Sequence, residues 1–158
     1  SAQKLNPNEY FILVVGHLPQ QLYSAEEIQL IQELSLTLSQ NSYMRFDYYI
    51  PEEEEFNKLL EISDIIYLQY KQHSFSSNIL TKSIKFRKPV IVNNSYIMKK
   101  VVKTYDWQAV APENPDKIAQ TIVSLADFQI NEDKYTQFLT EYAHSKFNSV
   151  ISQALKRI

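Results

Sequence analysis

The segment from Ser63 to Asn94 restricts the possible folds more than any other part of this 158-residue chain. In order, it reads as a buried strand, a polar loop, a helix that begins at Ser-Ser-Asn, and a second buried strand that begins at Pro89. Two strands joined through a helix form a parallel pair with a right-handed crossover. Open α/β sheets bind ligands beyond the carboxyl ends of such strands, so the loop from Tyr70 to Asn78 is the first place to expect a site.

Strand and helix patterns alternate along the whole chain. Strands are predicted at 10–15, 44–50, 65–70, 89–92 and 107–110, and helices at 24 to about 39, from 51, at 77–86, 97–105, from 115, 133 to about 142 and about 145–157. We therefore predict a single α/β domain over residues 1–158, Rossmann-like and three-layered. Its parallel sheet would have about five strands with helices on both faces, followed by C-terminal helices.

Three helix starts carry recognisable signatures. Ser24 with Glu27 has the spacing of a capping box, and Asn114-Pro115 places a cap before proline at the first helical position. Pro51 is predicted to be the first residue of another helix, with the acidic run 52–55 at the positive helix end. An acidic run of this kind is explained by a helix start without any catalytic role.

Charge and residue counts exclude several classes of site. The net charge of −2 argues against a large nucleic-acid footprint, which needs a concentrated basic face. The absence of cysteine excludes disulfides, thiolate metal ligands and a thiol nucleophile, and it fits a reducing compartment. The three histidines are not spaced as metal ligands on one helix face, so we expect no metal and no cofactor. The longest apolar runs are far below the roughly 20 residues of a membrane span.

Gly16 is the only glycine in the chain. A Walker A loop and the Gly-x-Gly-x-x-Gly fingerprint both need several glycines so that backbone can approach phosphate. A phosphate site in this chain must therefore be built from serine, asparagine and helix ends, whose N–H groups attract anions.

Several short strings, in order, resemble the C-terminal, donor-binding half of GT-B glycosyltransferases, in particular retaining family 4. The first strand ends in Val15-Gly16, and Gln69-Tyr70 stands where the family has Pro-Tyr. The sequence 76–80, Ser-Ser-Asn-Ile-Leu, followed by 86–91, Phe-Arg-Lys-Pro-Val-Ile, resembles a family helix start and the strand after it. Residues 98–102 and 110–122 resemble the family's short helix, next strand and penultimate helix, so the resemblance covers nearly the whole chain.

The resemblance implies a role for particular residues. Ser76, Ser77 and the N–H of Asn78 would contact the donor diphosphate, with His17 as the nearest cation after the first strand. The floor of the donor pocket would include Tyr70, with His73 and Lys71 as local sources of charge. Tyr49 and Ile50 would hold the nucleotide base, largely through backbone.

This chain also departs from the family. Most members have two glutamates seven residues apart in the donor sugar pocket, and those positions are Ser74 and Lys82 here. The loop after the first strand lacks the family's arginine and lysine. A helix end contributes about 0.3–1 kcal/mol to an exposed anion, or ~2 kcal/mol when partly buried, whereas micromolar affinity needs about 8 kcal/mol. We therefore expect weak donor binding by this chain alone.

Simpler interpretations remain for the same residues. Ser76 to Asn78 are preferred helix caps, and capping alone is the alternative to a phosphate site. Lys82, Lys85, Arg87 and Lys88 lie at a helix end where cations are favourable, which is the alternative to a basic patch for lipid headgroups or donor phosphate. The sequence assigns no catalytic residue.

Two functional hypotheses follow. The first is the donor-binding domain of a bacterial glycosyltransferase that moves a hexose from a UDP- or GDP-linked sugar to a polysaccharide or lipid-linked acceptor. Its partners would be the nucleotide sugar and a missing N-terminal acceptor half, in a cytoplasmic enzyme with attachment to the inner membrane surface as a further option. The second is a Rossmann-like binding or regulatory module that has lost donor chemistry.

Overall fold

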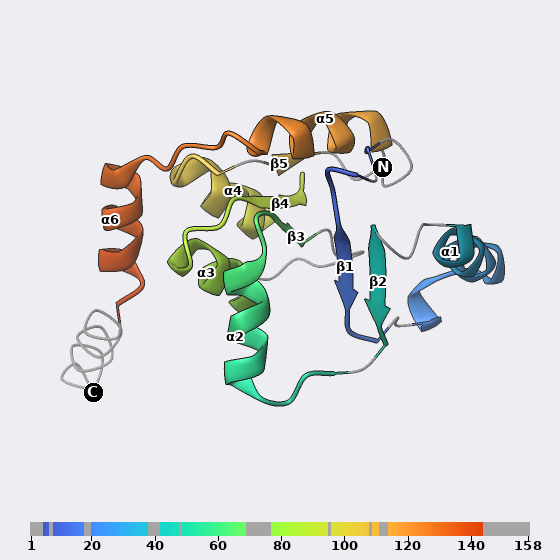
Figure 1. Ribbon diagram of the computed structural model, residues 1–158. Coiled ribbons are helices and arrows are strands. Elements are labelled where there is room, and N and C mark those ends of the chain that lie inside the picture. The colour runs from blue at the N-terminus through green and yellow to red at the C-terminus, as the bar shows by residue number, and fades with distance from the viewer. Residues whose placement is uncertain are drawn as a thin grey trace.

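The computed structural model describes residues 5–6, 8–17, 20–37, 42–47, 49–68, 77–94, 96–107, 109–110 and 114–143 (Figure 1). Its elements alternate between strand and helix, as the sequence predicts. They are β1 (Ile12–Val15), η2 (Gln20–Leu22), α1 (Ala25–Thr37), β2 (Tyr43–Phe46), α2 (Glu53–Ile62), β3 (Ile66–Leu68), α3 (Asn78–Lys85), β4 (Val90–Asn93), α4 (Tyr96–Thr104), β5 (Ala109–Val110), α5 (Pro115–Leu125) and α6 (Glu132–Glu141). The helix predicted at about 145–157 lies outside the described residues.

The described strands are all parallel, but they form two sheets in place of the single sheet predicted. β1 pairs with β2, and β4 pairs with both β3 and β5. No pairing between β1 and β3 is present in the described residues. The strands are two to four residues long, so each ladder has few hydrogen bonds, and β1 carries no buried side chain that would bring it against β3.

The β3-β4-β5 sheet is covered on both faces, and this part of the prediction is confirmed. Val90 and Val92 of β4 face the larger hydrophobic cluster, to which helices α2, α3, α4 and α6 contribute. Ile91 lies on the opposite face of the strand and packs with Ile118 and Leu125 of α5. A strand that is apolar on both faces needs this double cover, so β4 is the centre of the domain.

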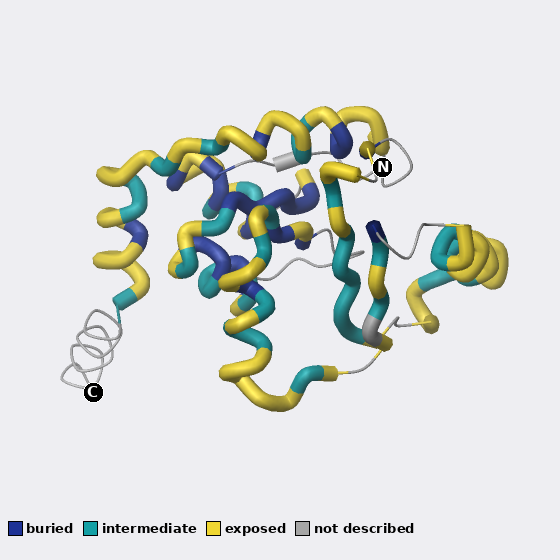
Figure 2. The backbone as a smooth tube through the Cα atoms, in the orientation of Figure 1, coloured by how far each residue is buried: buried dark blue, intermediate teal, exposed yellow. Residues whose placement is uncertain are grey.

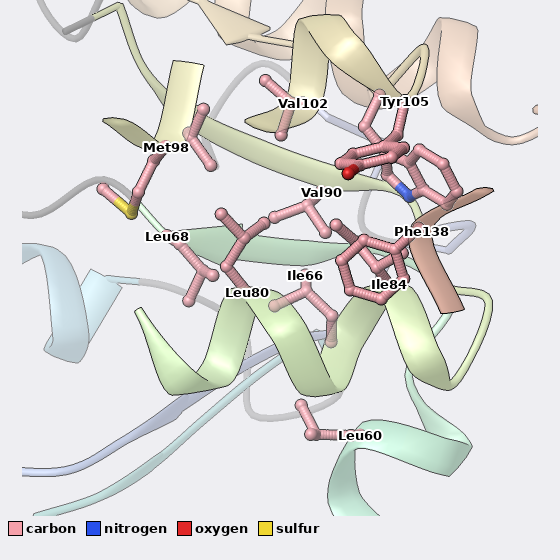
Figure 3. Close-up of a cluster of buried hydrophobic side chains, with 12 residues drawn as sticks. Leu60, Ile66, Leu68, Leu80, Ile84, Val90, Met98, Val102, Tyr105 and Phe138 are labelled. Atoms are coloured by element: carbon pink, nitrogen blue, oxygen red, sulfur yellow. The ribbon is translucent and has the colours of Figure 1, made fainter. Parts of the chain in front are cut away.

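Figure 3 shows how the larger cluster is filled. Leu80 and Ile84 lie one turn apart on α3 and point at β3 and β4, where both are almost completely buried. Phe138 of α6 closes the cluster and lies edge-on to Tyr105, with ring centroids 5.1 Å apart. The i, i+4 spacing on α3 therefore determines which way this helix faces the sheet.

Two of the three predicted helix starts are confirmed and the third is displaced. The Glu27 N–H donates to Ser24 Oγ at 3.2 Å and the Ser24 N–H donates to Glu27 Oε2 at 2.8 Å, which completes the capping box. The Lys117 N–H donates to Asn114 Oδ1 at 2.9 Å, with Pro115 at the first helical position. Pro51 is not the first residue of α2, because Glu52 has an extended backbone and the helix begins at Glu53.

Burial predicts a large difference between two isoleucines. Ile84→Ala removes a side chain from the core, where it has no solvent exposure, and we expect a loss of about 2–5 kcal/mol in the free energy of unfolding. Ile62→Ala, at a mostly exposed position at the end of α2, should change it by no more than about 0.5 kcal/mol. Denaturant unfolding of the two variants measures the difference, and equal losses would contradict this account of the core.

Candidate functional site

Several of the described residues that the sequence singled out follow the carboxyl ends of strands. His17 follows β1, Tyr49 and Ile50 follow β2, and Ser77 begins the helix after β3. Within each sheet all strands run the same way, so their carboxyl ends lie at one edge. The carboxyl edge of a parallel sheet is where α/β proteins place ligands, so the carboxyl edges of the two sheets make up the candidate site.

The start of α3 has the geometry predicted for it. Ser77 is the N-cap, with extended backbone, and its Oγ accepts a hydrogen bond from the Leu80 N–H at 3.4 Å. Its carbonyl oxygen accepts the Thr81 N–H at 3.2 Å. Ser77 is only 7% exposed, whereas Asn78, the first helical residue, is exposed. The capping interpretation of Ser77 is therefore confirmed, while its role toward a ligand stays a prediction.

Capping leaves part of the helix end available for a ligand. The Ser77 hydroxyl occupies the N–H of the third helical residue, whereas the N–H groups of Asn78 and Ile79 have no partner within the helix. These two groups point out of the amino end of α3, where the helix dipole also favours an anion. A phosphate oxygen is a suitable acceptor for them.

The turn after β1 depends on the single glycine of the chain. Gly16 has a φ of +114°, a backbone conformation that residues with a Cβ rarely adopt. The turn delivers His17 to the end of β2, where its Nδ1 lies 3.8 Å from Asp47 Oδ1. Arg45 Nη2 approaches the same oxygen at 3.3 Å. His17, which could serve as a cation only when protonated, thus lies beside a carboxylate that would compete with a diphosphate for it.

The predicted base-binding residues differ in their exposure. Tyr49 is 75% exposed and Ile50 is half-buried, both in the segment between β2 and α2. An exposed ring at the end of a strand can stack on a planar base, and a half-buried aliphatic side chain can cover its other face. Their role stays a prediction.

Lys82 makes a structural contact with α2. Its Nζ donates to Glu53 Oε1 at 2.9 Å and to Asn57 Oδ1 at 3.2 Å, and it lies 5.6 Å from the ring centre of Phe56. The side chain is only 20% exposed. At one of the two positions where the resemblance places a sugar-binding glutamate, this chain therefore has a cation that ties α3 to α2.

The basic residues that follow Lys82 are directed away from the candidate site. Arg87 and Lys88 lie just before β4, at the amino end of the strand, opposite the edge where Asn93 ends it. The Arg87 guanidinium donates to Glu132 and stacks 4.5 Å from the ring centre of Tyr135, and the hydrogen bond to Glu132 raises its pKa. Lys88 Nζ donates to the Glu61 carbonyl at 2.6 Å. Neither position suits contact with donor phosphate.

Asn93 is a residue of interest that sequence reasoning did not select. It is the last residue of β4, is 7% exposed, and lies beside Val110 of β5 at the carboxyl edge. A signal was present in the sequence, because an apolar strand that ends in two asparagines places an amide where parallel sheets bind ligands.

The remaining predictions fall outside the described residues. These are Ser76 in the diphosphate group and Tyr70, Lys71, His73 and Ser74 in the donor pocket. The described residues contain no cluster of three histidine, aspartate or glutamate side chains able to hold a metal. Among the described helices, none has the length and apolar character needed to cross a membrane.

Comparison with solved structures identifies proteins of the same fold. No family model and no curated protein matches the sequence. The chain superposes on Anabaena HepE in complex with UDP with a TM-score of 0.75 at 17% identity, over 99% of this chain and 43% of HepE. HepE in complex with UDP-glucose gives a TM-score of 0.73 at 15% identity, again over 99% and 43%. AviGT4, a glycosyltransferase involved in avilamycin A biosynthesis, gives 0.64 at 10% identity, over 93% of this chain and 43% of AviGT4.

These likenesses establish the fold. The chain has a glycosyltransferase-like α/β fold, and it spans less than half the length of each of these proteins. At such low sequence identities, the structural agreement establishes a similar backbone fold and says nothing about individual site residues. The agreement does cover almost the entire chain, including both sheets.

The contact between Lys82 and Glu53 predicts a pH dependence. The Lys82 hydrogen bond and charge lower the pKa of Glu53 from 4.5. A carboxylate with a lowered pKa in the folded state stabilises the protein above the unfolded pKa and loses that contribution as the pH falls through the folded value. The free energy of unfolding of Glu53→Gln should therefore be lower than that of the wild type at about pH 7, and the difference should shrink as the pH falls below 4.5. Denaturant unfolding at a series of pH values measures this difference in the free energy of unfolding, with Glu55→Gln as the control. A difference that does not depend on pH would contradict the prediction.

Proposed function

We propose that this chain is the donor-binding part of a glycosyltransferase that transfers a hexose from a UDP- or GDP-linked sugar. The observation that supports the proposal best is the start of α3. A helix with a buried serine cap lies at the carboxyl edge of a parallel sheet, in a fold shared with a protein crystallised with UDP and UDP-glucose. The acceptor would be a polysaccharide or a lipid-linked sugar, as the resemblance to the donor half of GT-B enzymes suggests.

The proposed chemistry uses positioning and electrostatics. The N–H groups at the start of α3 would bind the diphosphate of the donor, and their fixed dipoles would stabilise the negative charge that develops on it as the sugar leaves. No group in this mechanism requires a metal or a cofactor. Holding donor and acceptor in reactive geometry would supply much of the remaining rate enhancement.

The proposed residues divide by the part of the donor they would contact. Ser76, Ser77, Asn78 and His17 would contact the diphosphate, and Tyr49 and Ile50 the base. The sugar pocket would be formed by Tyr70, His73, Ser74 and Lys82. Lys82 could contribute to it only through its side-chain methylene groups or after release from Glu53, because its charge is engaged there.

The rest of the enzyme would supply what this chain lacks. The chain spans 43% of HepE and of AviGT4, and a second half would carry the acceptor site and close over the donor. Positive charge from that half would complement the diphosphate, since Lys82, Arg87 and Lys88 of this chain are engaged with its own carboxylates and carbonyls. We place the complete enzyme in the cytoplasm, with attachment to the inner membrane surface as an option.

A titration with nucleoside diphosphates tests the proposal. We expect UDP or GDP to shift the backbone amide resonances of residues 75–80, His17 and 49–51, with a dissociation constant weaker than micromolar. The reason is that a helix end supplies only ~2 kcal/mol of the about 8 kcal/mol that micromolar affinity needs. No shifts at millimolar nucleotide would refute the proposed site, and sub-micromolar binding would show that its charge is misjudged.

A matched pair of cap variants separates binding from stability. Ser77→Ala and Asn131→Ala each remove a helix N-cap, and each should lower the free energy of unfolding by about 0.5–2 kcal/mol. Asn131 caps α6, whose first turn contacts Arg87 at the amino edge of the sheet, so only Ser77→Ala should weaken nucleotide binding. Calorimetric titration of both variants with nucleotide measures the binding. Equal weakening of nucleotide binding in the two variants would point to loss of fold as the cause.

One observation favours a second function. Lys82 stands where the resemblance expects a glutamate, and its charge is used to hold α2. A helix contact in place of a sugar contact suits a domain that binds or regulates and has lost donor chemistry. Amide shifts with nucleoside diphosphates but no transfer of sugar by the complete protein would favour this alternative.

A further inference from the structure

No described residue of β1, α1 or β2 belongs to either of the two hydrophobic clusters, although Leu5, ahead of β1, is buried. Every residue of both hydrophobic clusters lies between Phe56 and Phe138. We define β1, α1 and β2, residues 12–46, as the first unit, and residues 53–143 as the main block. Figure 2 shows buried residues gathered in the main block, whereas the first unit is mostly intermediate or exposed and lies to one side.

Apolar side chains of the first unit remain largely in contact with solvent. No residue of α1 is buried, and the four residues of β1 are all only partly buried. Leu36 and Leu30 of α1 are 86% and 54% exposed. Because burial of apolar surface is the main source of stability, the first unit is stabilised far less than the main block.

The described polar contacts of the first unit are internal. The Ile12 N–H donates to the Ser42 carbonyl at 2.8 Å, and the hydroxyls of Ser35 and Tyr43 lie 3.3 Å apart. A two-stranded sheet held by its own ladder is marginally stable, and parallel strands in particular are normally covered on both faces.

The candidate site is divided between these two parts. His17 follows the last strand residue of β1 by two positions, and Tyr49 and Ile50 follow β2. Ser77 and Asn78 belong to the main block. A ligand that contacts both groups would connect the first unit to the main block.

We propose that the first unit opens as a separate cooperative unit, and that a nucleoside diphosphate bound across the two parts holds it closed. The second half of this inference rests on the proposed function. A ligand that binds only the closed form reduces the open population by the factor 1 + [L]/Kd. At about 100 times Kd, opening of the first unit should be about 100-fold less frequent.

Hydrogen exchange of the ligand-free protein tests the opening itself. Amides of β1 and β2 should exchange faster than those of β3 and β4, although both are strand amides.

Val14→Ala in β1 and Val101→Ala in α4 form a matched pair, because both valines are partly buried. Val14→Ala should raise exchange in the first unit by roughly five- to thirty-fold and leave the main block unchanged. Val101→Ala should raise exchange in the main block and leave the first unit unchanged.

The opposite pattern overturns the inference. Equal exchange in the two parts, or equal effects of either variant on both parts, would mean that residues 12–143 open as one unit. Because this measurement uses no ligand, its result does not depend on whether the proposed function is correct.

Exchange in the presence of UDP tests the second half. Saturating UDP should slow exchange in β1 and β2 by up to about 100-fold and change the interior of the main block little. Amide shifts at Ser77 and Asn78 without slower exchange in the first unit would overturn the closure and leave the proposed function standing. No UDP binding at millimolar concentration would overturn both the closure and the proposed function.

Discussion

The burial of β4 between two layers of helices is the contact on which the rest of the structure depends. Val90, Ile91 and Val92 have no solvent exposure, and they face clusters on opposite sides of the sheet. A strand of this kind cannot be stable without cover on both faces, so it recruits α3 and α4 on one side and α5 on the other. The placement of α3 then brings Ser77 to the carboxyl edge. The candidate site is thus a consequence of core packing.

Several cations of this chain contact groups of the protein itself, whereas a diphosphate site would need cations that are available to the ligand. Lys82, Arg87 and Lys88 bind groups of the protein itself, and His17 lies beside Asp47. These contacts hold α2 and α6 against the sheet, at positions that the resemblance left open to a role in phosphate binding. The backbone N–H groups at the start of α3 add an attraction for an anion that has direction but limited strength. Such a site orients a ligand better than it retains one.

The division into the first unit and the main block also affects how a ligand would be bound. The two hydrophobic clusters, which lie within residues 56–138, support α3, while β1 and β2 pair only with each other among the described strands. Residues that would contact the base and the diphosphate from the side of β1 are therefore carried by the less stable part. Donor binding and completion of the site would then be thermodynamically linked, and each would favour the other.

The sequence by itself determined the local structure. Ser24, Ser77 and Asn114 are caps because their side chains bond N–H groups three residues away, and the apolar runs of β1 and β4 are strands, all of which depends on near neighbours in the chain. Only the tertiary structure decided that the strands form two sheets, that α2 begins at Glu53 and not at Pro51, and that Lys82 binds Glu53. The burial of Asn93 at the sheet edge was likewise decided by the tertiary structure. Contacts between residues far apart in sequence depend on which surfaces pack together, and a pattern of residue types does not specify that packing.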